Sequence, residues 1–438
     1  MGNIVEDNRP SWTSKYAFIV TTVGSAVGLG NIWRFPYVMG QNGGAIFLAV
    51  YILIISTICF IPLLNELYIG KFTKKECIGA YESINPKFKY LGVLNPITAT
   101  LIASFYVVVG GWIINYICKS ILSYKITDYG EYFASFIQQP IYSCSLTLTF
   151  LFICIFFTAR GVKKGIEAVN KFLMPLLAIL LIFLVITSLG LPNSNIGLEY
   201  MFKPDFSKLN SHLFLAALGQ AFFTLSIGTG TLLTYGSYIK EDKTLVKSVY
   251  TIILSDTSFA LLAGIMIFPA VFSFNMEPNS GAGLAFVTLP KIFSQIPYGS
   301  WISFAFFILL FSAAVTSAIS MIECPCATLV EKLKISRVKA CTLLFFIILL
   351  FAIPATLSFG NLENFKIFGK TVFDLLDFFT SNIMLPFNAL VLCLISGWYL
   401  KLKGFTLLNN KVFGILFDLG LKYLLPIALV GLIIIGLR

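Results

Sequence analysis

The chain has 438 residues, of which 58% are hydrophobic and only 12% are charged. Soluble domains carry roughly 25% charged residues, and disordered chains combine low hydrophobicity with high net charge, so this composition excludes both classes. The formal net charge is +11, but the basic residues stand in short segments between apolar runs, so we expect no basic domain and no nucleic-acid partner.

Eleven apolar runs are long enough to cross a membrane as helices, which takes about 20 residues each. The first run starts after Arg9, contains Lys15, and continues without a small-residue cleavage site, so we expect a retained span rather than a signal peptide. The sequence therefore predicts an all-α integral membrane protein. The predicted spans are 14–39, 44–70, 91–124, 141–158, 166–188, 213–239, 246–274, 299–330, 339–356, 374–400 and 411–436.

The loops between the spans indicate the orientation of the chain. If the N-terminus lies inside, the inner loops hold about three times as many Lys and Arg residues as the outer loops. Cytoplasmic loops carry such an excess of positive charge. Because the number of spans is odd, the C-terminus is then expected outside.

Two spans contain clusters of glycine that predict a break in the helix. The first span has Gly24, Gly28 and Gly30, and the sixth has Gly228 and Gly230. Glycine inside a helix costs roughly 1 kcal/mol relative to alanine, and broken helices in lipid occur only where they face protein or a cavity. The alternative is that these glycines only allow close packing of helices.

Breaks at matching positions in two halves are typical of transporters built from inverted repeats, with a binding site near the middle of the membrane. We therefore expect a 5+5 inverted repeat with broken helices 1 and 6 and one extra helix. The predicted divisions are residues 1–190 for the N-terminal tail and spans one to five, 210–400 for spans six to ten, and 411–438 for span eleven.

Few ionisable residues lie inside the spans, and such residues are costly and usually functional. Glu66 could accept hydrogen bonds from the broken backbone. Asp256 is either a protonated structural acid or an ion ligand, because an isolated charged carboxylate in lipid is unfavourable. The residues in question are Arg34, Glu66, Asp256, Glu323, Asp377 and Lys422.

Nine cysteines are too few for a disulfide scaffold. The Cys324-Pro325-Cys326 segment is not expected to bind metal, because the chain has one histidine and no second cysteine pair of this kind. Cysteines in apolar runs are expected to be small core residues. They are Cys59, Cys118, Cys154, Cys341 and Cys393.

Several segments together resemble the neurotransmitter:sodium symporter family. Residues 24–36 read GSAVGLGNIWRFP, followed by NGG at 42–44. Further matching segments are QAFFTLSIGTG at 220–230, SAAVTSA at 312–318 and DLLD at 374–377. The resemblance covers roughly residues 9–400, and eleven spans are similar to a bacterial subgroup of tyrosine-transporter-like proteins.

The resemblance implies a sodium-coupled importer of amino acids, not an enzyme, in the bacterial inner membrane, working by alternating access. It implies two sodium sites. The ligands of the first would be Gly24, Val27, Ala313, Thr316 and Ser317, and those of the second Ala26, Asn31, Thr224 and Asp256 together with the substrate carboxylate. Thr316 and Ser317 could instead bond only to their own helix.

Asp256 stands where the family usually has Asn, and the position used for chloride or for an acid falls on Ala260. The resemblance therefore implies that Asp256 supplies the negative charge and that chloride is not required. Gly28 stands where relatives that transport amines have Asp, which implies an amino acid as the substrate.

The resemblance also assigns the substrate pocket and two gates. The pocket carries no charged side chain, which favours a neutral aromatic or bulky apolar amino acid. The implied pocket residues are Ser25, Ala26, Gly28, Leu29, Gly30, Ile102, Tyr106, Phe223, Thr224, Ser226, Thr229, Ser317 and Met321. The implied gates are Arg34 with Asp377 outside, and Arg9 with Glu331, Trp12 and Tyr238 inside.

Two other functions stay open from the sequence. A transporter of the same architecture could work without sodium, and would then not need the hydroxyls and the carboxylate near the breaks. A channel or a receptor would be a different class of membrane protein. The sequence fixes neither the number of ions nor the oligomeric state, and membrane lipid is the expected surrounding.

Overall fold

The computed structural model describes residues 9–122, 126–240, 245–277, 283–402 and 411–437. Within these ranges the chain is helical apart from turns and one isolated bridge between Ile367 and Lys370. The predicted all-α membrane fold is confirmed. Among the described residues, nine helices are long and apolar enough to cross a membrane, and ten if one bent pair counts as a single span.

The first five spans follow the predicted order. They are α1 (Lys15–Ala26) with the π-helical turn η1 (Gly30–Arg34) and α2 (Phe35–Gln41); α3 (Ala45–Thr57) with α4 (Phe60–Thr73); α7 (Leu94–Ile121); α9 (Pro140–Ala159); and η3 (Val162–Glu167) with α10 (Ala168–Leu189). The connecting elements are α5 (Cys77–Ile84), η2 (Pro86–Phe88), α6 (Lys89–Gly92), α8 (Tyr129–Ile137), α11 (Ser194–Phe202) and η4 (Phe206–Lys208).

The remaining spans are α12 (Ser211–Thr224) with α13 (Thr231–Ser237); α14 (Leu245–Ser273); α16 (Gly299–Leu333); α17 (Arg337–Leu357); α18 (Val372–Phe378) with η6 (Phe379–Met384), α19 (Leu385–Leu394) and η7 (Ile395–Tyr399); and α21 (Lys411–Leu419) with η8 (Gly420–Leu424) and α22 (Leu425–Gly436). Between α14 and α16 lie η5 (Leu284–Thr288) and α15 (Leu289–Phe293).

Both predicted breaks are present. The first span bends by 49° between Lys15–Ala26 and Gly30–Gln41. The sixth span is divided into α12 and α13, with residues 225–230 outside any helix. Each half is too short to cross a membrane alone, so the sixth span is not among the ten spans counted above. Counted as one broken span, α12 and α13 together give the predicted number of eleven.

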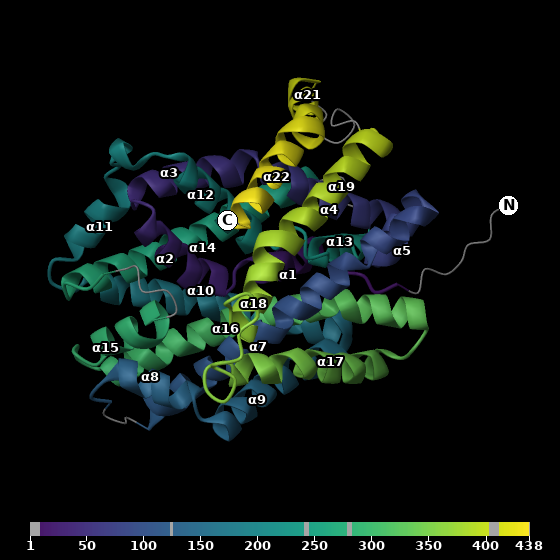
Figure 1. Cartoon of the computed structure of the whole chain (residues 1–438). Coiled ribbons are helices and arrows are strands. Elements are labelled where there is room, and N and C mark those ends of the chain that lie inside the picture. Colours follow the sequence, from purple (N-terminus) through teal and green to yellow (C-terminus); the bar gives the residue numbers. More distant parts are fainter. Residues whose placement is uncertain (1–8, 123–125, 241–244, 278–282, 403–410, 438) are drawn as a thin grey trace.

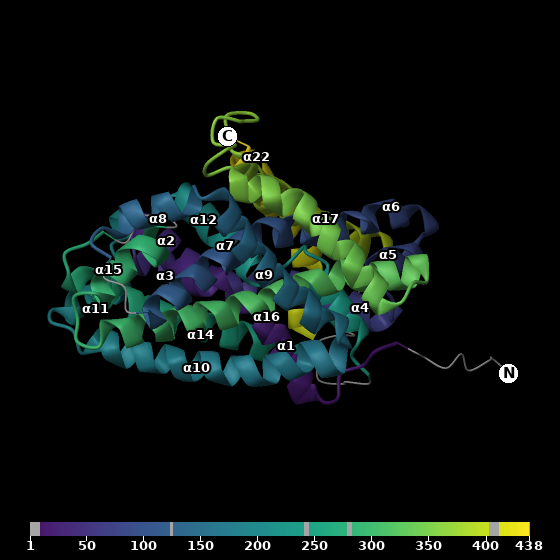
Figure 2. The same cartoon turned by 90° about the horizontal axis from the view of Figure 1, so that it is seen from below.

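The packing places the broken spans in the centre of the bundle. The long helices α7 and α16 pack along each other and against α9 and α17, and α10 packs on α14 (Figure 1). The halves α1 and α13 lie between these groups, and α13 also packs against α4. Figure 2 shows α8, α11 and α15 at one end of the bundle, and α5 and α6 near the other.

Candidate functional site

The break in the first span redirects hydrogen bonds from the helix to side chains. In a continuous helix the Gly28 and Leu29 N–H groups would bond the Gly24 and Ser25 carbonyls. Here Gly28 N–H donates to Asn31 Oδ1 (3.1 Å) and Leu29 N–H donates to the Tyr106 hydroxyl (3.2 Å). The carbonyls released at the end of α1 therefore face groups from other helices.

Other side chains donate to these released carbonyls. The Ser317 hydroxyl on α16 lies 3.4 Å from both the Gly24 and the Ser25 carbonyl oxygens. The Ser226 hydroxyl lies 3.3 Å from the Ser25 carbonyl. Carbonyls at the C-terminal end of a helix carry partial negative charge, so the end of α1 is suited to a cation or an ammonium group.

The break in the sixth span is held open by left-handed backbone and by two buried side chains. Ser226, Gly228 and Gly230 have φ angles of 55°, 83° and 76°. Gly228 donates its N–H to Glu66 Oε1 (2.7 Å), as the sequence suggested for Glu66, and its carbonyl accepts from Asn388 Nδ2 (2.8 Å). These contacts satisfy peptide groups that have no helical partner, as a break inside a membrane requires.

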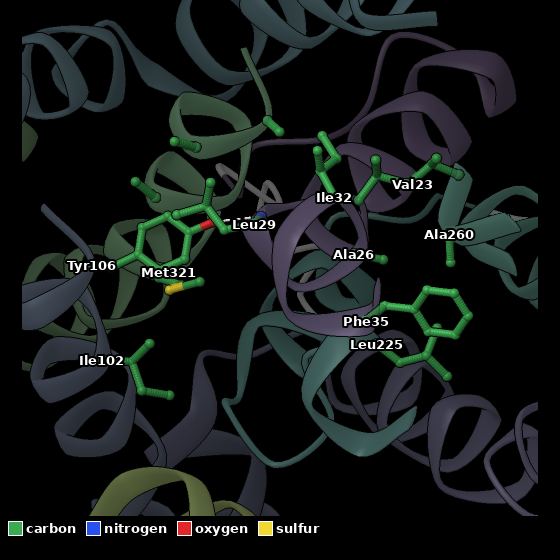
Figure 3. Close-up of a cluster of buried hydrophobic side chains, with 14 of the residues drawn as sticks. Val23, Ala26, Leu29, Ile32, Phe35, Ile102, Tyr106, Leu225, Ala260 and Met321 are labelled. Carbon is green, nitrogen blue, oxygen red and sulfur yellow. Dashed lines mark hydrogen bonds between the residues drawn. The ribbon is translucent and has the colours of Figure 1, made fainter. Parts of the chain in front are cut away.

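The two breaks border one small cavity. Figure 3 shows Ile102, Tyr106 and Met321 on one side of the first span, with the Tyr106 hydroxyl joined to Leu29. The cavity volume is about 20 Å³, which is enough for about one water molecule, so side chains must move apart before an amino acid fits. The lining residues are Ser25, Ala26, Gly28, Gly30, Ile102, Tyr106, Phe223, Thr224, Ser226, Thr229, Ser317, Met321 and Leu385.

Twelve of the lining residues are those that the sequence assigned to the substrate. The thirteenth assigned residue, Leu29, contacts the site through its N–H group. Leu385, at the start of α19, is an additional lining residue that no motif indicated. Within the cavity lining there is no charged side chain.

The residues assigned to the first sodium site come from α1 and α16. The Thr316 hydroxyl donates to its own helix, at the Ala313 (3.1 Å) and Ser312 (3.0 Å) carbonyls, as the alternative interpretation expected. Ser317 instead contacts the Gly24 carbonyl across the helix pair. A hydroxyl that donates its proton keeps its lone pairs, so both hydroxyls can still act as oxygen ligands.

The second assigned site surrounds Asp256, which is fully buried on α14. Its Oδ1 atom accepts from Asn31 Nδ2 (2.8 Å) and from the Thr224 hydroxyl (3.1 Å), and its Oδ2 atom accepts from the Tyr51 hydroxyl (3.4 Å). All three contacts are donated to the carboxylate, which leaves lone pairs for a cation. Tyr51 belongs to none of the matching segments, and its contact with Asp256 was not predicted. Ala260 lies buried one turn after Asp256 on α14.

The donor set suits a hard cation held by oxygen. Among the residues described in the structure, no three of His, Cys, Asp and Glu gather as a metal site. Carbonyls, hydroxyls, one amide and one carboxylate remain. Oxygen ligands of this kind can replace the water shell of an alkali ion.

The residues that the resemblance assigned to the inner gate are joined to one another. Arg9 forms an ion pair with Glu331 and also donates to the Ser237 hydroxyl from Nε (3.1 Å) and Nη2 (2.7 Å). Trp12 packs edge-on against the Tyr238 ring, with the centroids 5.8 Å apart. The four assigned residues therefore lie together, and Tyr238 also donates to the buried Glu323 (2.6 Å).

The residues that the resemblance assigned to the outer gate are not joined in this conformation. Among the described residues Arg34 and Asp377 form no ion pair; the Arg34 guanidinium lies 4.2 Å from the centre of the Phe223 ring. Asp377 accepts a hydrogen bond from the Ser381 hydroxyl (2.9 Å). The attraction between a cation and an aromatic face instead holds Arg34 against Phe223, which lines the cavity.

The chain is similar to known proteins over nearly its whole length. The model of the "Sodium:neurotransmitter symporter family" matches residues 9–129 and 133–437. A protein of Bacillus subtilis described as "Uncharacterized sodium-dependent transporter YhdH" is 39% identical over 395 residues, covering 89% of this chain and 88% of its own length. A sodium-dependent transporter of Methanocaldococcus jannaschii, also uncharacterized, is 33% identical over 411 residues, covering 89% and 82%.

A solved structure shares the whole fold. The crystal structure of MhsT in complex with L-phenylalanine has a TM-score of 0.90 and 42% sequence identity, covering 98% of this chain and 99% of that one. The architecture of bent and broken helices is therefore common to both chains.

Proposed function

Because the chain belongs to the sodium:neurotransmitter symporter family, we propose that it imports a neutral amino acid with an aromatic or bulky apolar side chain together with sodium. Membership in the family makes the chain a sodium-coupled membrane transporter and not an enzyme. The observation that carries the finer proposal is the cavity bordered by two breaks and lined without any charged side chain.

The cavity offers one set of partners for each end of a zwitterionic amino acid. The substrate carboxylate would bond the N–H groups of Leu29 and Gly30 and the Tyr106 hydroxyl. The amino group would bond the carbonyls of Ala26 and Phe223, together with further oxygens of Thr224 and Ser226. Peptide N–H groups at the start of a helix favour an anion, and carbonyls at the end of a helix favour a cation.

The side chain of the substrate would lie among Ile102, Phe223, Thr229, Ser317 and Met321. A methionine can adapt its shape to different apolar groups, and Thr229 leaves more room than an aromatic residue would. The L-phenylalanine bound in the similar MhsT structure supports a substrate of this size. A charged substrate side chain would have no counter-charge in this lining.

Two sodium ions complete the proposal, one between α1 and α16 and one beside Asp256. The substrate carboxylate would be a ligand of the second sodium ion. Binding of the ion and binding of the substrate would therefore each raise the affinity of the protein for the other. Asp256 would supply the negative charge there, and transport would not need chloride. Two ions entering with a zwitterion carry two charges, which gives about 4–5 kcal/mol at a potential of 100 mV.

Alternating access would use the two gates in turn, with spans 1, 2, 6 and 7 moving against the others as parts of an inverted repeat. The closed inner gate and the separated Arg34 and Asp377 fit a conformation oriented toward the outside. The positive charge of the predicted inner loops supports an N-terminus in the cytoplasm and a C-terminus outside.

Uptake into proteoliposomes tests the proposal. We expect labelled phenylalanine and tyrosine to accumulate under an inward sodium gradient, and unlabelled lysine and glutamate to compete poorly. Equal uptake with sodium replaced by choline would refute the coupling. Strong competition by charged amino acids would refute the assigned pocket.

A further inference from the structure

The cysteines form two buried pairs. Cys77 Sγ lies 3.5 Å from Cys324 Sγ, and Cys326 Sγ lies 3.6 Å from Cys341 Sγ. All four side chains are buried, whereas Cys118, which the sequence placed in the core, is exposed because it lies on the outer face of α7 near its end. The first pair joins α5 to α16 and the second joins α16 to α17. A disulfide bond would therefore restrict the motion of different helices in the two cases.

The first pair packs against the end of the broken segment in the sixth span. Cys77 is the first residue of α5, and its sulfur lies 3.3 Å from the Gly230 carbonyl and 3.6 Å from the Thr234 hydroxyl. A Cβ atom added to Gly230 would lie 2.7 Å from Cys77 Sγ and 3.0 Å from Cys324 Sγ. The two thiols therefore touch Gly230, the residue directly before α13, which follows Thr229 in the cavity wall.

A second contact connects the same two helices to the inner gate. The Glu76 N–H group, directly before Cys77, donates to Glu331 Oε2 (3.4 Å). Glu331 lies seven residues after Cys324 on α16, which is about two turns along the same face. Glu331 is also the partner of Arg9. A bond between α5 and α16 would therefore act where the gate closes.

We propose that Cys77 and Cys324 are a modification site, at which a peroxide oxidises the two thiols to a disulfide that holds the inner gate closed. The effect on transport rests on the proposed function, because α5 continues from span two of the moving group and α16 is span eight of the other. The sulfur atoms need to approach by about 1.5 Å to reach the length of a disulfide bond.

The chemistry balances with one peroxide for each pair. One sulfur attacks a peroxide oxygen, so that an S–O bond forms, the O–O bond breaks and a water molecule leaves. The second sulfur then attacks the sulfenic sulfur, the S–O bond breaks, and a second water leaves with the remaining thiol proton. The two thiols lose two electrons in total and the peroxide gains them. Hydrogen peroxide is nearly as small as water. When the inner gate opens during the transport cycle, peroxide would reach the two thiols next to Gly230.

The second pair provides a matched comparison within the same chain. Cys326 and Cys341 join α16 to α17, which are connected by residues 334–336 and lie in the same group of spans. A disulfide there would join two helices that are already neighbours in sequence. We expect it to leave transport unchanged.

The test uses the full-length protein in proteoliposomes, with Cys118→Ser and Cys144→Ser to remove the two cysteines that are not buried. After hydrogen peroxide, mass spectrometry of non-reduced peptides should find residues 77 and 324 linked. Sodium-driven phenylalanine uptake should fall at least tenfold while sodium-dependent phenylalanine binding stays within twofold, and dithiothreitol should restore uptake.

Variants identify the pair that is responsible. Cys77→Ser and Cys324→Ser should each abolish the loss of uptake, with Cys77→Ala as a replacement if the serine variant folds poorly. The double variant Cys326→Ser and Cys341→Ser should remain as sensitive as the parent protein.

Three results would overturn the proposal: no linked peptide, full linkage with unchanged uptake, or equal peroxide sensitivity in Cys77→Ser. If the reduced protein takes up no amino acid, the proposed function fails instead, and the linked peptide and the binding assay still decide whether the thiol site exists.

Discussion

Replacing Asp256 by asparagine separates the charge of this side chain from its hydrogen bonds. Oδ1 accepts from Asn31 and Thr224, and an amide oxygen can take its place. The amide NH2 group would then face the Tyr51 hydroxyl, which can accept a hydrogen bond as well as donate one. Asp256→Asn should therefore keep the packing and the polar contacts and remove only the negative charge.

The loss of that charge sets the expected size of the effect. A unit charge about 4 Å from a monovalent cation contributes roughly 4 kcal/mol at an effective dielectric constant of about 20. Part of this is offset, because burying the carboxylate itself costs free energy. We expect a net loss of about 1.5–3 kcal/mol, which corresponds to a rise of about 10- to 100-fold in the sodium concentration that gives half-maximal uptake.

The assay is phenylalanine uptake as a function of sodium at constant ionic strength, with choline as the replacement. Asp205→Asn is the matched control, because Asp205 is exposed in the loop before α12. A second series replaces chloride with gluconate, and the unaltered protein should keep its uptake. An unchanged sodium dependence in Asp256→Asn would refute the assigned role, and a chloride requirement in the unaltered protein would refute the argument about charge.

Three further substitutions test other parts of the structure. Gly28→Ala places a methyl group 2.4 Å from a wall oxygen in a cavity of about 20 Å³, so phenylalanine binding should weaken at least tenfold, while Gly431→Ala, with open space around it, should bind normally. Glu331→Gln removes a partly exposed ion pair contributing about 1 kcal/mol, so alkylation of Cys77 from the inside should be about fivefold faster; an unchanged rate would contradict the gate. Gly236→Ala places its Cβ 2.5 Å from a carbonyl oxygen of α4, and should destabilise the protein by about 1–3 kcal/mol, measured as a lower melting temperature in detergent.

The sequence predicted those features that depend on local composition. Apolar runs of sufficient length indicate spans whatever they pack against, and glycine clusters indicate where a helix is easy to interrupt. Residues 24–36 and 220–230 contain both the glycines and the side chains that border the breaks. The cavity lining itself was assigned from the resemblance to the neurotransmitter:sodium symporter family, since Ile102, Tyr106, Ser317 and Met321 lie outside both segments.

Features that depend on how distant helices meet were not predictable in the same way. Leu385 and Tyr51 lie in ordinary apolar helices, and only the packing of α19 and α3 brings them to the cavity and to Asp256. The π-helical turns, such as η6, leave no mark in composition because they need only one extra residue in a turn. Arg34 can interact with Asp377 or with the ring of Phe223. The sequence does not indicate which of the two it contacts in a given conformation.

The two proposed ion sites differ in the helices that they connect, and this difference assigns them different tasks. Asn31, Thr224 and Asp256 belong to spans one, six and seven, respectively, and these spans are in the same proposed moving group. An ion bound among them would move with this group and keep its ligands throughout the transport cycle. Its main effect would be on the substrate, whose carboxylate completes its shell.

Gly24 and Ser317 belong to spans one and eight, which lie on opposite sides of the proposed moving boundary. An ion between them would lose ligands as soon as α1 moves away from α16, and it would therefore favour the conformation with the inner gate closed. An ion can shift this equilibrium only by the difference between its affinities for the two states, and here that difference follows from ligands that come together in one state alone. Coupling of sodium to the substrate and coupling of sodium to the gate would thus lie in separate sites that share the broken first span.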